Sequence, residues 1–517
     1  MRSPRARLSG RTFGFEQLEA RLTMSAVPGS LEPASVELHA AKKKLGNSYP
    51  TGLTPAATRS YYGFDKVDFN GVAADGTGQT IAIVVARNNP NIANDLAVFD
   101  QTFGLPAPPS FKVVNQYGGS KLPKSNKGWA SEAALDVQWA HAIAPGANIL
   151  LVEAKNDSML NFIEAIDYAR NVPGVTVVSV SAAGPEFKQE AVVDSLFTTP
   201  PGHEGVTFVF AAGDDGGVAM YPSSSPNVLS VGGTTLYQAS NAQWHREEVW
   251  NYGGGGDSLY EGVPSYQAGL GLASRGTPDV AYNADPYTGF SVYDSYAHRG
   301  WVTFGGTSAG APQWAALVAI ANQGRELAGK APLASAQAAL YAMPSSDFHD
   351  ITAGHNMAHF AGAGYDLASG LGSPIADRLI PDLVAFNGST EFTVGLPPVV
   401  ANSGKSKHRF AASIDSLARL TPASSLESGL GSLRSVAASS LDIAHVDDAG
   451  SDAALALVDV MPVTGDDVVL NTGGVVSGRS RLGSARRSAG ASTSLAGGDL
   501  SGVDAFFAGL GASTAVA

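Results

Sequence analysis

A serine in the stretch FGGTSAGAP, residues 304–312, is the first residue of this sequence that could do chemistry. Two glycines lead into Thr307 and Ser308, and the stretch QWAALVAIANQ that follows reads as a buried helix. Several hydrolase folds present a nucleophilic serine at such a tight strand-to-helix junction. A serine hydroxyl becomes a good nucleophile when a base accepts its proton and a third group orients that base. The sequence must therefore supply partners for Ser308.

Histidine is the usual base, but none of the ten histidines lies in a motif that suggests this role. His141 is followed by AIAPGAN and His298 by RGW, so a structural or solvent-exposed position is the better interpretation of each. The sequence has no HExxH motif, and a zinc hydrolase of that type therefore lacks its ligands. It also has no cysteine, which excludes disulfides and thiolate metal sites.

Carboxylates are the alternative to histidine. In GWASEAALDVQWAHAIAPGANI, Glu132 and Asp136 stand four residues apart, so on a helix they share one face. A solvated acidic pair is the simpler interpretation, but neighbours such as Val137 and Trp139 indicate a buried helix. Two close carboxyls share a proton, and this raises the pKa of one of them. Glu132 could then accept the proton of Ser308 while Asp136 steadies Glu132.

A third acidic residue, Asp214, lies in FVFAAGDDGGVAMYPSSS, directly after an apolar run and at the start of a glycine-rich turn. The carboxyl end of a strand is where α/β folds place ligands. The simpler interpretation is a turn in which the Asp side chains bond to the backbone. If Asp214 is protonated, it could instead donate a hydrogen bond to a developing oxyanion, as a neutral carboxylic acid does in ketosteroid isomerase.

These side chains can act together only if the fold brings them to one edge of a sheet. Short, β-branched apolar runs alternate with helical patterns, which is typical of parallel strands buried on both faces. The alternation predicts an α/β fold of three layers with a mostly parallel central sheet and right-handed crossovers. The predicted strands are 80–86, 147–154, 175–183, 206–213 and 228–234, and the predicted helices include ASEAALDVQWAHAI and SMLNFIEAIDYARNV.

Together these motifs resemble those of the sedolisins, serine-carboxyl peptidases with a subtilisin-like fold in which a glutamate takes the place of the histidine. The resemblance runs from about 52 to 388. It rests on ExxxDVQ at 132–138 followed by IAPGANI, AAGDDG at 211–216, YPSSSPNVLSVGGT at 221–234, RGTPDVAYNADPYTG at 275–289 and GGTSAGAP at 305–312. By motif, Ser308 is the nucleophile and Glu132 the general base and acid, with Asp136 as its partner and Asp214 as the oxyanion donor.

The resemblance implies a serine-type endopeptidase that acts on protein or peptide substrates by acyl transfer. Ser308 attacks a peptide carbonyl, Glu132 carries the serine proton to the leaving amine, and water resolves the acyl-enzyme. Because Asp214 must be protonated to donate, we expect activity to fall as the pH rises through the pKa of Asp214, which predicts an acid optimum.

The family also implies one structural calcium ion, and its pattern is present in HDITAGHNMAHFAGAGYDLASGLGSP. The ligands would be the carboxylates of Asp350 and Asp366 and the carbonyl oxygens of Ile351, Gly362 and Gly364. An all-oxygen set at a glycine-rich loop suits Ca²⁺, a hard cation that accepts irregular geometry. The simpler interpretation is a Gly/Asp turn without metal.

The sequence departs from the family in two places. Where the family has S-x-S-W-G along the substrate, this chain reads SVSAA at 179–183, with Ala182 in place of Trp and Ala183 in place of Gly. We expect the missing aromatic wall to reshape a pocket and the Cβ of Ala183 to crowd a substrate backbone, so subsite preference cannot be carried over. About fifty residues precede the predicted domain, fewer than the long folded prodomain that is usual in the family.

Four regions are predicted along the chain. Residues 1–26 end in FEQLEARLTMSA, which resembles the leader of large exported bacterial proteins; 27–51 is a linker or pro-region remnant; and 52–388 is the sedolisin-like peptidase domain. Residues 389–517, rich in Ala, Ser and Gly, predict a largely disordered tail. No apolar run reaches the roughly 18 residues that span a bilayer. These features predict an exported protein, extracellular or on the cell surface.

Whole-chain composition limits the partners. The net charge of −13 argues against nucleic acid as a general partner, and we expect a monomer. A non-catalytic exported scaffold protein that keeps the peptidase fold is the main alternative function, favoured by the short N-terminal region and the altered substrate strand. An esterase of the α/β-hydrolase type is a weaker alternative, because no clear acid-then-histidine order follows Ser308.

Overall fold

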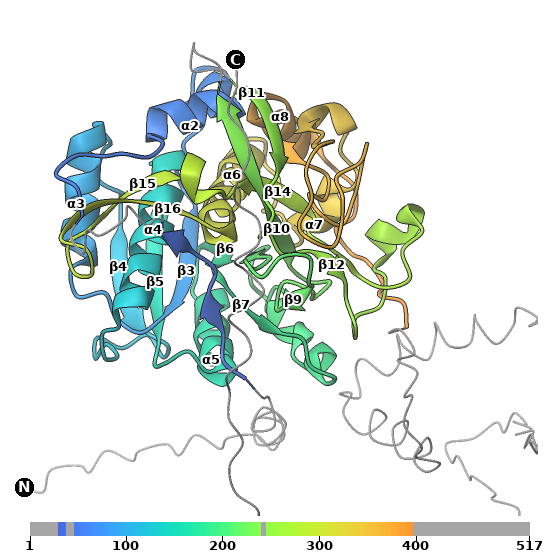
Figure 1. Ribbon diagram of the computed structural model, residues 1–517, viewed down its shortest axis with the longest axis horizontal. Helices are drawn as coiled ribbons and strands as arrows, with labels where there is room; N and C mark the ends of the chain where they lie inside the picture. Colours follow the sequence, from blue (N-terminus) through green and yellow to red (C-terminus); the bar gives the residue numbers. More distant parts are fainter. Residues whose placement is uncertain (1–28, 38–45, 239–243, 397–517) are drawn as a thin grey trace, which may run out of the picture. The chain divides into compact units, whose positions relative to one another are not determined.

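The computed structural model describes residues 29–37, 46–238 and 244–396 of the 517-residue chain. Its core is an eight-stranded sheet in the order β11-β10-β8-β6-β3-β5-β4, with β14 also paired to β10 (Figure 1). All neighbouring pairs are parallel except β10 with β11. In chain order the strands are β3 (Thr80–Ala86), β4 (Phe111–Asn115), β5 (Asn148–Ala154), β6 (Val175–Val180), β8 (Thr207–Ala211), β10 (Leu229–Gln238), β11 (Trp244–Val249) and β14 (Val280–Asn283).

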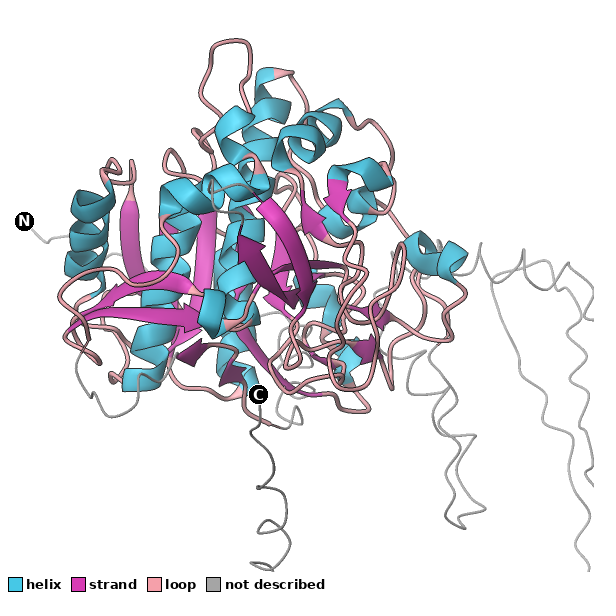
Figure 2. Ribbon diagram, turned by 45° about the horizontal axis from the view of Figure 1, so that its top comes forward, coloured by secondary structure: helices cyan, strands magenta, loops and turns pink. Residues whose placement is uncertain are grey.

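Helices cover both faces of this sheet (Figure 2). All residues of β6 are buried, as are all but the first of β3 and β5. Because successive side chains of a strand point to opposite faces, both faces must be covered. Helices α4 (Lys127–Ile143) and α6 (Thr307–Leu327) pack against each other on one face, and α5 (Met159–Arg170) contacts β3, β5 and β6 as the other layer.

Local sequence signals set the starts of several helices. Thr54, Asn126 and Ser158 each accept a hydrogen bond from a first-turn N–H of the helix that follows, namely α2 (Pro55–Tyr62), α4 and α5. Helix α6 differs, because the residue before it is Gly306, which has no side chain to cap it. The first N–H groups of α6 therefore need partners from elsewhere in the fold.

The remaining elements are short, and two of them come from the N-terminal segment. Strand β1 pairs with β7 and β2 pairs with β16, so residues 29–37 lie against strands that flank the start of α6. The other strands and helices are β1 (Glu32–Pro33), β2 (Val36–Glu37), β7 (Ala182–Pro185), β9 (Met220–Tyr221), β12 (Gly256–Asp257), β13 (Gly276–Thr277), β15 (Phe290–Asp294), β16 (Gly300–Gly305), β17 (Phe348–His349), β18 (Ser373–Pro374), α3 (Ile92–Phe103), α7 (Ala336–Leu340) and α8 (Ala376–Ala385). Six 3₁₀ helices complete the described part of the chain: η1 (Phe64–Lys66), η2 (Glu190–Val192), η3 (Asp194–Phe197), η4 (Ser265–Leu270), η5 (Pro286–Thr288) and η6 (Ser345–Asp347).

The predicted α/β fold of three layers with a mostly parallel central sheet is confirmed. The predicted leader at 1–26 and residues 397–517 of the predicted tail lie outside the described residues. Part of the predicted linker, 27–51, forms β1 and β2 and pairs with the domain. The domain boundaries at 27, 52 and 389 stay predictions.

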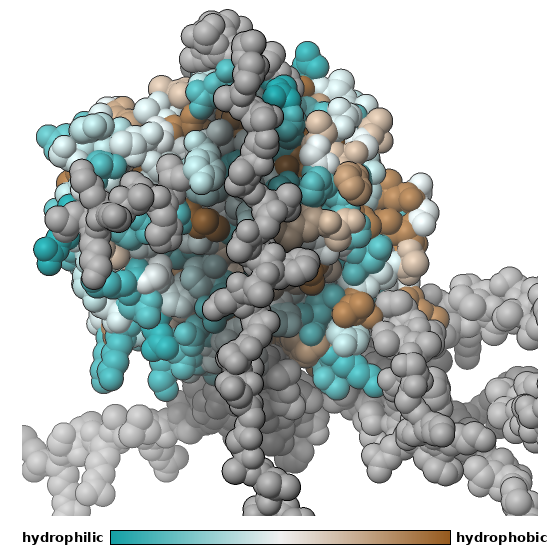
Figure 3. All heavy atoms as spheres, viewed as in Figure 1, coloured by the Kyte–Doolittle hydropathy of each residue, from teal (hydrophilic) through white to brown (hydrophobic). Residues whose placement is uncertain are grey.

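The surface gives no sign of a bilayer-spanning element in the described part of the chain. None of its helices combines the length and the apolar character needed to cross a membrane. Polar and apolar residues are interspersed on the face drawn in Figure 3, which is ordinary for a folded domain.

Candidate active site

Ser308 lies in the first turn of α6, directly after β16 and Gly306. Gly306 has a φ of +90°, a left-handed backbone conformation that favours glycine. A Cβ at this position would lie 2.4 Å from both the Ala34 carbonyl oxygen and Asp214 Oδ2. Ser308 is fully buried, and its Oγ donates to the Ser181 carbonyl oxygen at 3.3 Å. The Ser308 backbone N–H, an otherwise unpaired first-turn donor, donates to the Ala34 carbonyl oxygen at 2.8 Å.

Glu132 and Asp136 lie one turn apart on α4, and both are fully buried. Burial raises the pKa of Glu132 to about 7; the nearby hydroxyls of Ser35 and Ser308 oppose this shift without reaching hydrogen-bond geometry. Burial, and then the charge of Glu132, raise the pKa of Asp136 well above its usual value.

Three oxygen atoms of this carboxyl pair are free to hold a proton. Ser181 Oγ donates to Asp136 Oδ1 at 2.7 Å, but Asp136 Oδ2 and both oxygens of Glu132 have no hydrogen-bond partner among the described residues. A buried acceptor without a hydrogen bond lowers the free energy of unfolding, and a proton shared by the two carboxyl groups reduces this loss. The pair is therefore suited to take a proton from Ser308 and to return it.

Asp214 follows β8 and lies against the start of α6. Its Oδ1 accepts hydrogen bonds from the Thr307 backbone N–H at 2.8 Å and from Thr307 Oγ1 at 2.9 Å. Its Oδ2 is shielded from solvent and has no partner among the described residues. Burial raises the pKa of Asp214 to about 8, and the two bonds from Thr307 oppose this shift. The carboxyl therefore holds a proton at acid and neutral pH, and Oδ2 is the oxygen free to carry it and donate it.

The four catalytic candidates predicted from the sequence thus lie together, on α4, after β8 and at the start of α6. Two further residues were not predicted: Ser181, which holds Asp136, and Thr307, which holds Asp214. Both stand inside motifs that the sequence singles out, SVSAA and GGTSAGAP. Their roles depend on which carboxylate each hydroxyl meets, and spacing along the chain does not reveal that.

Strand β7 begins directly after Ser181, the residue whose carbonyl oxygen accepts from Ser308 Oγ. Its Ala182 and Ala183 are buried, and β1 pairs with them antiparallel, with Pro33 opposite Ala182 and Glu32 opposite Ala183. The crowding expected from the Cβ of Ala183 therefore does not prevent a backbone from pairing with this strand.

On the other side of Asp214 a cavity of about 910 Å³ opens, next to Val36 and Glu37. Its wall includes the aromatic side chains of Trp250 and Tyr252, and Tyr252 is exposed. Because Asp214 is among its lining residues, this cavity lies beside the candidate catalytic group.

A second group of buried carboxyls lies beside β7 and β9. Glu190 and Glu261 are almost fully buried, and burial raises their pKa values to about 10 and about 9. Burial also raises the pKa of Asp194 to about 6, while its hydrogen bonds, among them one from the Tyr221 hydroxyl, oppose this shift. Glu190 and Glu261 therefore hold their protons at acid and neutral pH, whereas Asp194 holds its proton only in acid. Such shifted groups make the stability of the folded protein depend on pH.

The chain is similar to several known peptidases. The subtilase family model matches residues 125–340. Kumamolisin of Bacillus sp. (strain MN-32) is 37% identical over 372 residues, 65% of this chain and 64% of that protein. Pseudomonas sedolisin, a serine-carboxyl proteinase solved with two molecules of pseudo-iodotyrostatin, superposes with a TM-score of 0.58 at 25% identity, covering 65% of this chain and 99% of that one.

The chain is similar to members of the sedolisin family over about two thirds of its length. Sedolisin of Pseudomonas sp. (strain 101) is also 33% identical over 210 residues, 35% of each chain. The subtilisin-like form of the α/β fold predicted from the sequence is confirmed by the match to the solved sedolisin. This chain spans less than two thirds of the length of kumamolisin and about a third of sedolisin.

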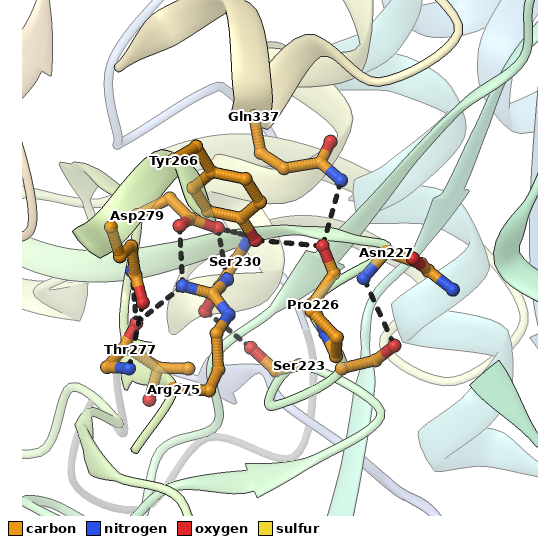
Figure 4. A network of polar contacts seen from close by, with 12 residues as sticks. Ser223, Pro226, Asn227, Ser230, Tyr266, Arg275, Thr277, Asp279 and Gln337 are labelled. Atoms are coloured by element: carbon orange, nitrogen blue, oxygen red, sulfur yellow. Dashed lines mark hydrogen bonds and ion pairs between the residues drawn. The ribbon is translucent and has the colours of Figure 1, made fainter. Parts of the chain in front are cut away.

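Two of the motifs that resemble those of the sedolisins meet in a buried network (Figure 4). Arg275 donates from Nη1 and Nη2 to the two oxygens of Asp279 at 2.7 and 2.6 Å, and both side chains are fully buried. Asp279 Oδ2 also accepts from the Ser230 N–H on β10 at 2.8 Å, which ties RGTPDV to YPSSSPNVLS. This paired, bidentate arrangement holds the segment around β13 against β10.

The residues predicted as metal ligands lie in the loop region that follows β17. The Gly364 N–H donates to both oxygens of Asp350 at 3.1 Å, and the Gly362 N–H donates to Asp366 Oδ2 at 2.8 Å. The carbonyl oxygens of Ile351, Gly362 and Gly364 accept no hydrogen bond from the described residues. Within the described ranges no group of three or more His, Cys, Asp or Glu side chains could hold a metal ion. Two carboxylates with free carbonyls in one loop fit Ca²⁺ better than a transition metal.

Proposed function

We propose that this chain is an acid-active serine-carboxyl endopeptidase, which hydrolyses peptide bonds of protein substrates through an acyl-enzyme on Ser308. The observation that carries the proposal is the convergence of three carboxyl groups with raised pKa values on one buried serine at a helix N-terminus. The relationship to kumamolisin and sedolisin supports the same activity.

In the proposed mechanism, Glu132 takes the proton from Ser308 Oγ as the oxygen attacks the carbonyl carbon of the substrate. The oxyanion receives hydrogen bonds from the Ser308 N–H and from the protonated Oδ2 of Asp214, and each such donor is typically worth roughly 2.7–4 kcal/mol. Glu132 then gives its proton to the leaving nitrogen, and water releases the acyl group. Asp136, held by Ser181, keeps the proton within the carboxyl pair.

The proposed acid optimum follows from two titrations. Asp214 donates only when protonated, so activity falls as the pH rises through its pKa, about 8 where the cleft is covered. Glu132 accepts a proton only when ionised, and its pKa of about 7 is raised mainly by burial. Burial is the largest cause of both shifts, so water that enters the site lowers both pKa values. We therefore propose that the optimum of kcat/KM lies on the acid side of neutrality.

We also propose that the loop of Asp350 and Asp366 binds one Ca²⁺, with the carbonyl oxygens of Ile351, Gly362 and Gly364 as neutral ligands. A bound ion would cross-link the loop and oppose the repulsion between the two carboxylates. This loop reaches the cleft, because the Val249–Gly354 bridge joins it to the end of β11, and the Cβ of Gly256 would lie 3.1 Å from His359 Nε2. We expect chelation to lower the thermal midpoint and isothermal titration with Ca²⁺ to give one site; titration without heat in wild type and in Asp366→Ala alike would contradict the site.

We propose export to the cell surface or medium from the sequence of residues 1–26. Mass spectrometry of the protein secreted by the native cell tests this, and retention of all the protein inside the cell would contradict it.

We also propose that the protein is a monomer in solution. Light scattering of purified protein tests this, and a stable dimer would contradict it.

Digestion of casein by the purified full chain from pH 3 to 8, with Ser308→Ala as control, tests the proposed activity. We expect cleavage on the acid side by the wild type only. Equal cleavage by the control would reject the role of Ser308. Absence of cleavage at every pH by a variant with an unobstructed cleft would favour the alternative, a scaffold protein that keeps the fold.

A further inference from the structure

Asn356 is the one fully buried residue of a loop that is otherwise open to solvent. Every other residue from 352 to 360 is exposed or only partly buried. The Asn356 side chain accepts a hydrogen bond from the His359 N–H at 2.9 Å and donates one from Nδ2 to the Leu367 carbonyl oxygen at 3.3 Å. These two bonds offset the cost of burying the amide, but they do not explain why it points inward. The reason lies in the segments that it packs against.

The Asn356 amide lies between two glycine-rich segments, 213–217 and 253–256. On one side, a Cβ on Gly217 would lie 2.8 Å from Asn356 Oδ1, and on the other, a Cβ on Gly255 would lie 3.0 Å from Asn356 Nδ2. Both separations are shorter than ordinary van der Waals contact, so the glycine backbones lie directly against the amide. Asn356 therefore fills the space between the two segments.

Backbone hydrogen bonds join the same two segments on both sides of Asp214. The Gly254 N–H donates to the Gly213 carbonyl oxygen at 2.7 Å, before Asp214, and the Gly216 N–H donates to the Tyr252 carbonyl oxygen at 2.9 Å, after it. The turn that carries Asp214 is thus held by the second glycine segment, and the buried amide packs against both.

The direction of the free oxygen of Asp214 depends on this turn. Thr307 holds Oδ1, whereas Oδ2, the oxygen that is free to donate, has no partner among the described residues. An oxyanion donor must lie roughly 2.7–3.1 Å from the oxyanion, and a displacement of about 1 Å can lower a rate about 10²-fold. A small movement of the turn would therefore weaken the donor without unfolding the domain.

We propose that Asn356 is a positioning residue for Asp214, which keeps the turn of the oxyanion donor in place by filling the space between the two glycine segments; this inference rests on the proposed peptidase function. Asn356 acts through the turn and not on the substrate. Its effect on catalysis must therefore disappear when residue 214 cannot donate. A residue that merely stabilised its own loop would lower activity whatever residue occupies position 214.

A double-mutant cycle tests the role, with kcat and KM measured on a fluorogenic peptide at pH 4. We expect Asn356→Ala to lower kcat about tenfold and to leave KM within about twofold. In the Asp214→Ala background, the same substitution should change kcat less than about twofold. Asn356→Asp keeps the shape and, while protonated, both hydrogen bonds, so its kcat at pH 4 should stay within about twofold of wild type. A similar fall in both backgrounds, or no fall in either, would overturn the proposal.

Asn322→Ala is the matched control for the loss of a buried amide. Asn322 is also fully buried, its Oδ1 accepts from the Leu333 N–H at 3.0 Å, and it stands on α6 several turns beyond Ser308. This variant should lower the thermal midpoint but keep kcat within about twofold of wild type. A loss of kcat in Asn322→Ala as large as that in Asn356→Ala would assign the effect to lost stability and would overturn the positioning role.

Hydrogen exchange separates this inference from the proposed function, because it needs no activity. The Gly216 and Val218 N–H groups are hydrogen-bonded, so peptides that cover 213–218 should exchange about tenfold faster in Asn356→Ala than in wild type or Asn322→Ala. If wild type cleaves the peptide, and Asn356→Ala shows neither the loss of kcat nor the faster exchange, the positioning role is wrong and the peptidase function stands. If wild type cleaves nothing between pH 3 and 8, the peptidase function fails; faster exchange would then still support the hold of Asn356 on the turn, and unchanged exchange would reject it.

Discussion

Replacement of Asp214 by asparagine tests the proposed oxyanion donor most sharply. The amide oxygen of asparagine can accept from Thr307 as Asp214 Oδ1 does, and its NH₂ group then stands where the unpartnered Oδ2 stands. The amide donates at every pH, whereas the carboxyl donates only below its pKa of about 8. At pH 9 only about a tenth of wild-type molecules with a filled cleft hold that proton, and at pH 10 about a hundredth.

We therefore expect kcat of Asp214→Asn to stay within about tenfold of wild type in acid and to lack the loss above pH 8. The ratio of variant to wild-type kcat should rise about tenfold per pH unit between 8 and 10. Asp214→Ala is the matched control: it removes the donor and should lose about 10²–10³-fold in kcat at every pH below 8. The assay is a fluorogenic peptide at saturating concentration, because kcat then reports the filled cleft. Parallel alkaline losses in Asp214→Asn and wild type would refute the role of Asp214.

Three further predictions concern other parts of the site. Ser181→Ala removes the hydrogen bond to Asp136 Oδ1 but keeps the backbone carbonyl of residue 181 that accepts from Ser308 Oγ. We therefore expect kcat to fall about tenfold with little change in KM. An unchanged acid limb of the pH–rate profile would argue against a positioning role for Ser181. Gly306→Ala forces a Cβ to within 2.4 Å of the Ala34 carbonyl oxygen and Asp214 Oδ2, so this variant should lose peptide cleavage. Gly269→Ala is the control, because its Cβ meets nothing within 4 Å and its kinetics should not change. Comparable kinetics in both variants would contradict this prediction. The third prediction concerns thermal stability, measured in Ser308→Ala to prevent self-digestion. The thermal midpoint should be highest near pH 4 and fall toward pH 8, because the folded-state pKa values of Glu190 and Glu261 are raised and the stability that they contribute is lost as the pH rises above their unfolded values near 4.5. A thermal midpoint that rises from pH 4 to 8 would contradict this prediction.

The sequence predicts the fold and the four reactive side chains because both leave local patterns. Apolar runs at strand spacing give the sheet, and the i, i+4 pair Glu132 and Asp136 on a buried helix raises the question of what holds a proton there. Ser308 and Asp214 follow strands in glycine-rich turns. Position 306 needs a glycine because its φ is positive and because a Cβ there would clash with its neighbours. These requirements involve residues close together in the sequence, so the sequence alone predicts them.

The positions of Ser181, Thr307 and residues 29–37 could not be predicted in the same way. The contact between Ser181 and Asp136 depends on how α4 packs over β6, and a serine in an apolar strand has many other uses. The segment GSLEPASVE has no alternation or turn signal that predicts pairing; β1 and β2 are two residues each and form because β7 and β16 offer free edges. Tertiary contacts of this kind decide structure where local preference is weak.

The pH dependence of kcat/KM for a peptide substrate, measured from pH 3 to 9 on the chain after incubation in acid, tests the central claim most directly. The claim is that carboxyl groups, in place of a histidine, activate Ser308 and hold its oxyanion. It predicts a bell with its maximum below pH 7, loss of activity before pH 9, and no activity in Ser308→Ala. Activity that still rises between pH 8 and 9, or that survives in Ser308→Ala, would contradict it.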